Sequence, residues 1–176
     1  MARVAFFTFG VLRRPTSHPQ SQGFVDRIAG AFAEASAAAG FIGYPQEKEA
    51  RPDNPRLVWP AAKGPDREAM MTLSLWQDLE SVFAFSYARQ GVHSDALRLR
   101  KEWFLKPAWP NYVAWWVGDD HLPTWQDAVD RHLQLSRHGP TADAFDFHAP
   151  YDAEGRPTRV LRRPIALDLA PRASRP

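Results

Sequence analysis

The sequence predicts an α+β fold, namely a ferredoxin-like β-α-β-β-α-β unit with one added C-terminal helix. Strand-like and helix-like hydrophobic patterns alternate along the chain in that order. The chain has 176 residues, of which 44% are hydrophobic and 24% charged, and this is ordinary for a globular domain with a sizeable core. We therefore expect one domain over residues 1–148, followed by a Pro- and Arg-rich tail over residues 149–176.

The first part of the chain carries two strand patterns around one helix pattern. The β-rich run Val4–Phe9 predicts the first strand. Residues 23–40 place apolar side chains at helical spacing, and Gly40 is expected to end that helix as a C-cap. Phe41–Tyr44 predicts a short second strand. The polar run Pro45–Ala69 is too long for a tight turn, so it predicts a flap over a pocket mouth, a passive excursion or a disordered loop.

A third strand and an interrupted helix follow that loop. Met70–Trp76 alternates apolar side chains on one face, which is typical of a strand. Asp78 then opens a helix that Gly91 breaks, because glycine is a weak helix former. Directly after the break, Val92–Phe104 predicts a second helical segment.

The last elements are a strand and a capped helix. Tyr112–Val117 predicts the fourth strand. Thr124 followed by Asp127 resembles a capping box and predicts the start of the added helix. Residues 139–140, Gly-Pro, end this helix, and residues 144–147 predict an additional edge strand.

A ferredoxin-like sheet has helices on one face only, so its other face is expected to be bare. Exposed apolar surface costs about 25 cal/mol per Å². We therefore expect a homodimer in which two sheets pair face to face as a dimeric α/β barrel, with Val4–Phe9, Met70–Trp76 and Tyr112–Val117 lining the interior.

His93 and Arg100 lie at the edge of the predicted apolar face of the helix Val92–Phe104. At about 100° per residue, they fall within about 60° of Leu97 and Phe104. The adjacent stripe of this helix is apolar and consists of Val92, Ala96, Leu99 and Trp103. The far side is polar and consists of Ser94, Asp95, Arg98, Lys101 and Glu102. We expect His93 and Arg100 to flank the core, where a histidine serves either as a ligand-binding or as a structural side chain.

Several stretches of the chain together resemble one protein family. They are MTLSLWQDLESVFAFSY, LRLRKEWF shortly after His93, and YVAWWV followed by HLPTWQDAVDRHLQL. From about Val4 to Phe147, the chain resembles the domain-of-unknown-function family 3291. The resemblance implies the dimeric α/β-barrel superfamily, which also contains the antibiotic-biosynthesis monooxygenases. Several members of that superfamily bind haem inside the barrel, and in its haem-degrading group the axial histidine lies on the second helix of the ferredoxin-like unit.

By this positional analogy, His93 is the candidate ligand for the iron of a haem b. Arg100 is the candidate partner for a haem propionate or a substrate carboxylate, and His121 is a further candidate acid–base group. The candidate walls of the haem pocket are aromatic: Phe83, Phe85, Phe104, Trp76, Trp115 and Trp116. Structural alternatives stay open: a cap of the helix break for His93, stacking or an ion pair for Arg100, and a place in the core or a dimer interface for the tryptophans.

Three functions follow from this set of candidates. The first is a haem-dependent small-molecule oxidoreductase, similar to the monooxygenases, that acts on a small hydrophobic metabolite. The second is a cofactor-independent barrel monooxygenase or isomerase with His93 or His121 as its acid–base group. The third is a non-catalytic ligand-binding or stress-response protein. A Soret band would separate the first from the others.

Composition and motifs exclude several other classes. The chain has no cysteine, which excludes disulfides and thiolate chemistry. It has no HExxH, Walker or Rossmann pattern. Its net charge is only +2, and a Pro- and Arg-rich tail is weak support for nucleic-acid binding. The brief apolar run at the N-terminus lacks a cleavage site, and no run reaches the roughly 20 apolar residues of a membrane span. We therefore expect a cytoplasmic protein that does not enter a membrane.

Overall fold

The computed structural model describes residues 1–45 and 67–161. The helices and strands in these two ranges are β1 (Arg3–Val11), a short 3-10 helix (Pro19–Ser21), α1 (Gln22–Ala37), β2 (Phe41–Gly43), β3 (Ala69–Trp76), α2 (Leu79–Ser86), α3 (Val92–Trp103), β4 (Tyr112–Val117) and α4 (Trp125–His138). The predicted α+β class and the predicted order of strands and helices are confirmed. Most of the predicted loop Pro45–Ala69 lies outside the described residues, as does the end of the chain from residue 162.

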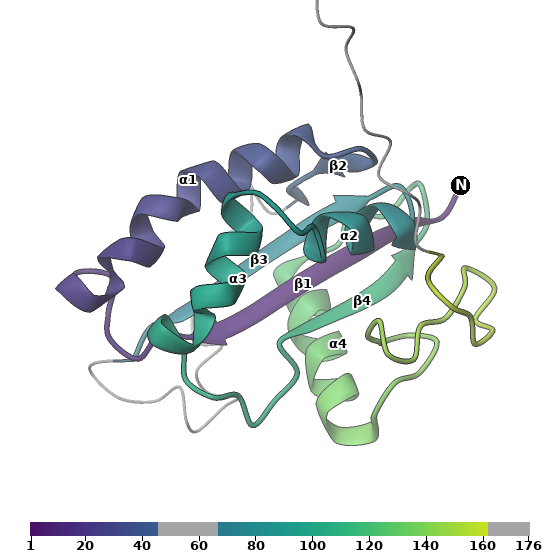
Figure 1. The fold of residues 1–176 in the computed structure, drawn as a ribbon. Coiled ribbons are helices and arrows are strands. Elements are labelled where there is room, and N and C mark those ends of the chain that lie inside the picture. The colour runs from purple at the N-terminus through teal and green to yellow at the C-terminus, as the bar shows by residue number, and fades with distance from the viewer. Residues whose placement is uncertain (46–66, 162–176) are drawn as a thin grey trace, which may run out of the picture.

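The four strands form one antiparallel sheet in the order β2-β3-β1-β4 (Figure 1). β1 is the longest strand and lies between β3 and β4, so Phe6 pairs with Ser74 on one side and with Ala114 on the other. β2 is short and pairs only with the end of β3, where Phe41 lies opposite Trp76. The sheet therefore depends mainly on the ladders that β1 makes with its two neighbours.

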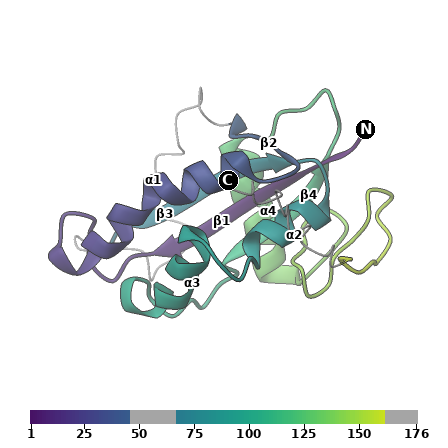
Figure 2. The same cartoon turned by 45° about the horizontal axis from the view of Figure 1, so that its top comes forward.

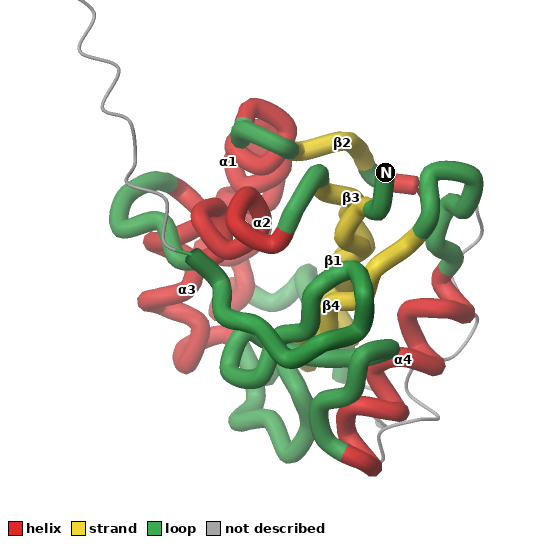
Figure 3. Tube along the Cα trace, turned by 90° about the vertical axis from the view of Figure 1, so that its right-hand side faces the viewer, coloured by secondary structure: helices red, strands yellow, loops and turns green. Residues whose placement is uncertain are grey.

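Helices cover both faces of the sheet, as the side view in Figure 3 shows. Side chains alternate along β1 because successive residues of a strand point to opposite faces. On one face, Phe7 and Phe9 contact the ring of His132 in α4, at 5.5 and 5.3 Å between ring centroids. On the other face, Val4 and Phe6 pack with residues of α2. The fold is therefore a three-layer arrangement with α1, α2 and α3 on one side and α4 on the other (Figures 1 and 3).

The prediction of a bare sheet face is wrong for the single chain. Phe7, Leu73 and Trp115 point to the face on which α4 lies, and each is at most 2% exposed. Trp125 and Leu135 of α4 belong to the same buried cluster. The added helix, which sequence patterns predicted without assigning it a face, supplies the cover that a second subunit was expected to supply. The bare face was the physical reason for expecting a homodimer. Because α4 covers that face, the homodimer stays a prediction without that reason.

The chain after α4 packs against the domain beyond the boundary expected at residue 148. Residues 144–147 do not form a strand, but Ala114 and Phe145 exchange backbone hydrogen bonds of 2.8 and 3.0 Å as an isolated bridge. The indole Nε1 of Trp116 donates to the carbonyl oxygen of Tyr151 at 2.8 Å. Val160 packs against the cluster that contains Val4 and Phe6. The segment thereby returns past β4 to α2 (Figures 1 and 2).

Candidate functional site

His93 lies in the first turn of α3, and a carboxylate from α1 holds that turn in place. The Glu34 side chain accepts hydrogen bonds from the backbone N–H of Val92 at 2.6 Å and of His93 at 2.8 Å. Gly91 has a φ of 113°, and a Cβ there would lie 2.5 Å from Oε1 of Glu34. Glycine at this position therefore lets the carboxylate reach the unpaired N–H groups at the helix N-terminus, where negative charge is also favourable.

The imidazole of His93 is half-buried in a row of stacked rings. It stacks on Phe85 at 4.5 Å between centroids, and Phe85 stacks on Trp76 at 5.3 Å. Its Nδ1 atom is buried and has no hydrogen-bond partner among the described residues. Burial lowers the pKa of His93 below its ordinary value of 6.5, and the negative charge of Glu34 offsets part of that effect. His93 is therefore neutral at physiological pH.

The lowered pKa of His93 predicts a pH-dependent stability. The unfolded chain takes up the proton first as the pH falls below about 6.5, so the free energy of unfolding should decrease from there towards the folded-state pKa. Urea unfolding between pH 8 and pH 5 should show this decrease, and the decrease should be smaller in His93→Phe. His138→Asn, at an exposed position outside this row of rings, is the control for removal of a histidine. Identical pH profiles for wild type and His93→Phe would contradict the prediction. His132, whose pKa burial also lowers, should supply the remainder.

The structure brings few of the predicted wall residues to His93. Trp76 stacks on Phe85, and Phe85 in turn stacks on His93. Both Trp76 and Phe85 are among the predicted wall residues. Trp116 is on the same sheet face as Trp76, whereas Trp115 is buried on the opposite face with α4. Phe104 follows α3 at its other end and packs edge-on against Phe24 of α1 at 5.1 Å. The predicted walls are thus divided between two faces of the sheet.

Arg100 and His121 also lie apart from the His93 ring. Arg100 is exposed and its guanidinium donates to the carbonyl oxygen of Leu97 at 3.0 Å, so the wheel position that it shares with His93 does not place it against the core. His121 is exposed and its Nε2 lies 3.1 Å from a carboxylate oxygen of Asp127. Asp127 is part of the capping box with Thr124, so His121 belongs to the start of α4. The three predicted catalytic residues therefore do not form one constellation.

These positions do not fit the predicted haem pocket. A haem needs an accessible imidazole nitrogen, a continuous apolar slot and a cation near the propionates. The neutral imidazole of His93 satisfies the first requirement in part, because its Nδ1 has no described partner but its ring face is covered by Phe85. The slot is interrupted because Trp115 lies on the opposite sheet face, and the guanidinium of Arg100 donates to the carbonyl oxygen of Leu97 on its own helix. Within residues 1–45 and 67–161, no three metal-binding side chains gather as a candidate metal site.

A different hollow lies between α2 and the segment that follows α4. We call it the aromatic pocket. Its lining residues are Phe83, Tyr87, Phe147, His148, Pro150, Thr158, Arg159 and Val160, and its volume is about 350 Å³. Phe83 was a predicted wall residue, while residues 144–147 had been expected to form a strand. The aromatic pocket could not be seen from the sequence, because its two sides are about 60 positions apart in the chain.

Phe147 is the centre of the aromatic pocket. Its ring meets Phe83 edge-on at 5.3 Å and Tyr87 edge-on at 5.9 Å. Beneath it, Phe147 packs on Tyr112 of β4 at 5.1 Å and on Phe6 of β1 at 5.6 Å. One side chain thus joins the sheet to α2, and offset or edge-on ring contacts of this kind are favourable beyond the area that they bury.

Tyr112 supplies the polar group beneath the aromatic pocket. Its hydroxyl accepts a hydrogen bond from the backbone N–H of Phe147 at 3.3 Å and lies 3.5 Å from the hydroxyl of Tyr87. Burial, and then the hydrogen bond with Tyr87, raise the pKa of Tyr112 far above its ordinary value of 10.0. Tyr112 is therefore a neutral phenol at physiological pH, suited to hydrogen bonding and unsuited to act as a base.

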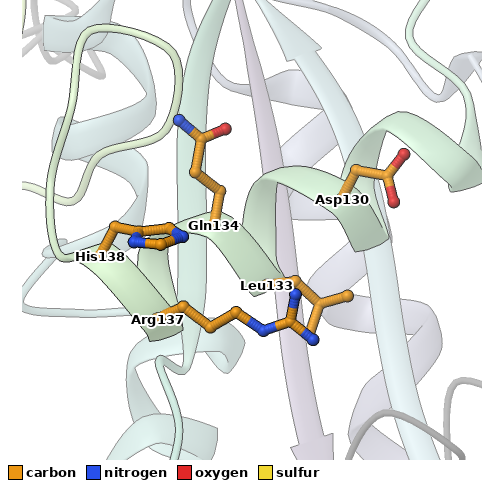
Figure 4. Close-up of a pocket in the computed structure, with 5 residues that line it drawn as sticks. All are labelled: Asp130, Leu133, Gln134, Arg137 and His138. Carbon is orange, nitrogen blue, oxygen red and sulfur yellow. The ribbon is translucent and has the colours of Figure 1, made fainter.

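A second hollow, of about 380 Å³, lies along α4 and is lined by Asp130, Leu133, Gln134, Arg137 and His138. Figure 4 shows that all five side chains come from this one helix. They lie at positions three and four apart, which is the spacing of a single helix face. No described residue from another element completes this hollow, so we do not treat it as the site.

Comparisons with known proteins give a family and no individual relative. No curated protein matches the chain, and no solved structure does. In the described residues, no helix has both the length and the apolar character to cross a membrane. The family model described as "Domain of unknown function (DUF3291)" matches residues 3–161. Because that match covers most of the 176 residues, the chain belongs to the DUF3291 family.

Proposed function

We propose that this protein binds a small, flat, largely apolar molecule in the aromatic pocket. The observation that carries the proposal is the group of three rings, Phe83, Tyr87 and Phe147, which line an open hollow of about 350 Å³. Small-molecule sites in proteins have volumes of about 300–1,000 Å³ and are lined mainly by apolar and aromatic side chains with a few polar groups. The hollow is at the lower end of that range, so its ligand is small.

Binding is better supported than catalysis at this position. The titratable residues that line the aromatic pocket are Tyr87, His148 and Arg159, and all three are exposed. His148 has the carboxylate of Asp146 at 3.6 Å, but its imidazole is exposed to water and is not enclosed in a site that would orient it towards a substrate. The phenol of Tyr112 beneath the pocket stays neutral. The pocket is thus better equipped to hold a molecule than to transform it.

Oxidoreductase or monooxygenase-like chemistry is the second candidate function, and one observation favours it. The imidazole of His93 is neutral and half-buried, and its Nδ1 has no described partner. A group in this state can serve as a base without a cofactor. The scattered positions of Trp115, Phe104 and Arg100 weigh against the haem-dependent form, so this candidate is better supported without haem.

We propose the ferredoxin-like unit and the dimeric α/β-barrel superfamily as the finer description of the fold. The antiparallel order β2-β3-β1-β4, with α1 between β1 and β2 and with α2 and α3 between β3 and β4, supports the ferredoxin-like unit. A homodimer belongs to the same proposal. Because α4 lies on the face that a barrel would enclose, such a dimer must either form elsewhere or displace α4.

The pocket proposal predicts binding of a neutral aromatic probe. N-phenylnaphthylamine, whose fluorescence rises in apolar surroundings, should bind the wild-type protein with saturation. Tyr87→Ala should weaken that affinity by about tenfold, because it removes one of the three rings that line the pocket. Tyr87 is 52% exposed, so its loss should leave the fold intact. Fluorescence titration measures the affinity, and thermal unfolding checks the fold.

Two further variants make this test specific. Tyr87→Phe keeps the ring and should keep the affinity of the wild type. Phe32→Ala removes a half-exposed ring on α1, outside the aromatic pocket, and should change nothing. Absence of saturable binding, or equal losses in Tyr87→Ala and Phe32→Ala, would reject the aromatic pocket as the binding site.

A further inference from the structure

The mouth of the aromatic pocket carries a cation that has no ion-pair partner among the described residues. Arg159 lines the pocket and forms no ion pair with any residue in the described part of the chain. The arginine three positions before it differs in this respect. Arg156 binds Asp152 and Glu154, each at 2.8 Å, and those carboxylates occupy its guanidinium. Of these two arginines, Arg159 is the one whose guanidinium has no described ion-pair partner and remains available to an incoming anion.

Backbone contacts on both sides hold Arg159 beside α2. The N–H of Thr158, one residue earlier, donates to the carbonyl oxygen of Pro150 at 2.9 Å. The N–H of Leu161, two residues later, donates to Oε1 of Glu80 in α2 at 3.3 Å. Since the chain is fixed before and after it, Arg159 stays close to the pocket mouth. Placement of this kind lowers the entropy cost of using its charge in binding.

Two acidic side chains on the elements that line the pocket, Asp146 and Glu80, already have partners. Asp146 accepts hydrogen bonds from the N–H groups of His148 at 2.8 Å and Ala149 at 3.1 Å, and its carboxylate also lies 3.6 Å from the imidazole of His148. Glu80 accepts from Leu161. Their charges reduce the positive potential at the mouth without occupying Arg159.

We infer that the ligand of the aromatic pocket is an amphipathic anion: a flat apolar body that packs on Phe83, Tyr87 and Phe147, with a carboxylate or sulfonate-like group that meets Arg159 at the mouth. This inference rests on the proposed function and adds the charge class of the ligand. A guanidinium matches the planar oxygen pair of a carboxylate and retains its charge at all physiological pH values.

The test compares two probes that share one skeleton. Anilinonaphthalene sulfonate is N-phenylnaphthylamine with an added sulfonate group, so the difference between their affinities reports on the anion. Arg159→Gln should weaken binding of the sulfonate probe by about tenfold and change binding of the neutral probe by less than about twofold. Arg156→Gln is the matched control from the same segment, and we expect it to leave the ratio of the two affinities unchanged.

The outcomes separate this inference from the proposed function. If neither probe binds with saturation, the proposed function fails. If both bind and Tyr87→Ala weakens both, but Arg159→Gln leaves their ratio unchanged, the aromatic pocket stands and the anion inference is overturned. Equal changes of the ratio in Arg159→Gln and Arg156→Gln would show a general charge effect, which also overturns it. A loss specific to Arg159→Gln, and smaller at high salt, supports it.

Discussion

Replacing Trp76 with alanine should lower the free energy of unfolding by about 3–5 kcal/mol, the largest single effect that we expect in this protein. Trp76 is 1% exposed and ends the strand β3. Its indole meets Phe41 edge-on at 5.2 Å and stacks on Phe85 at 5.3 Å, while its Nε1 donates to Oγ of Ser74 at 2.9 Å. Alanine leaves a cavity beneath α2 that the rigid sheet cannot close. Urea unfolding measures the loss.

The variant Trp76→Phe keeps most of the buried side-chain volume. It keeps an aromatic ring and loses the hydrogen bond to Ser74, so its cost should be about 1–2 kcal/mol. Because Phe85 lies between Trp76 and His93, Trp76→Ala should also loosen the surroundings of His93 and reduce the pH dependence that this histidine gives to stability. Equal losses for alanine and phenylalanine at position 76 would contradict the cavity explanation.

Replacing Gly40 with alanine should cost about 2–5 kcal/mol, the second largest effect. Gly40 has a φ of 79°, a region that costs an L-residue about 1–2 kcal/mol. A Cβ there would lie 2.2 Å from Oγ and 2.6 Å from Cβ of Ser81, which is buried in α2, and such overpacking costs about 1–3 kcal/mol more. The turn is also constrained because the carbonyl oxygen of Gly40 accepts from the N–H of Gln77 at 2.7 Å.

A double-mutant cycle tests the steric half of this cost. Ser81→Gly removes the atoms that clash and should cost about 1 kcal/mol alone, as glycine does inside a helix. In the presence of Ser81→Gly, the effect of Gly40→Ala should shrink by about 1–3 kcal/mol. Additive losses in the double variant would show that the backbone conformation alone makes position 40 sensitive. Chemical denaturation of the four proteins gives the coupling free energy.

The structure also corrects the role expected for Gly40. The sequence suggested a helix that continues to this glycine, whereas α1 ends at Ala37 and Ala38 is its C-cap residue. Alanine is as good a helix former as any, so the small residues near position 37 carry no local stop signal. Packing sets the end of the helix, since the chain must turn at Gly40 to bring Phe41 into line with Trp76.

The order and type of the four sheet strands and of the helices packed on them were determined by the sequence alone. Val4–Phe9, Met70–Trp76 and Tyr112–Val117 are strands, and the capping box of Thr124 and Asp127 starts α4 as predicted. These features depend on hydrophobic period and on hydrogen bonds between residues close in the chain, which sequence patterns contain directly. The start of α3 at Val92, directly after Gly91, was also found in this way, whereas α2 ends at Ser86, before that glycine.

Only the tertiary structure decided which faces of these elements meet. The wheel of α3 put Ser94 on the polar side, yet Ser94 is buried while Arg100 is exposed, because α1 with Glu34 determines how that helix is turned. Tertiary contacts also form the aromatic pocket, because Phe83 packs against Phe147, which lies far from it in the sequence. The spacing of hydrophobic residues shows that one face of a helix or strand is apolar, but it does not show which segment covers that face. That depends on contacts between distant segments, which α4 and the chain after it provide here.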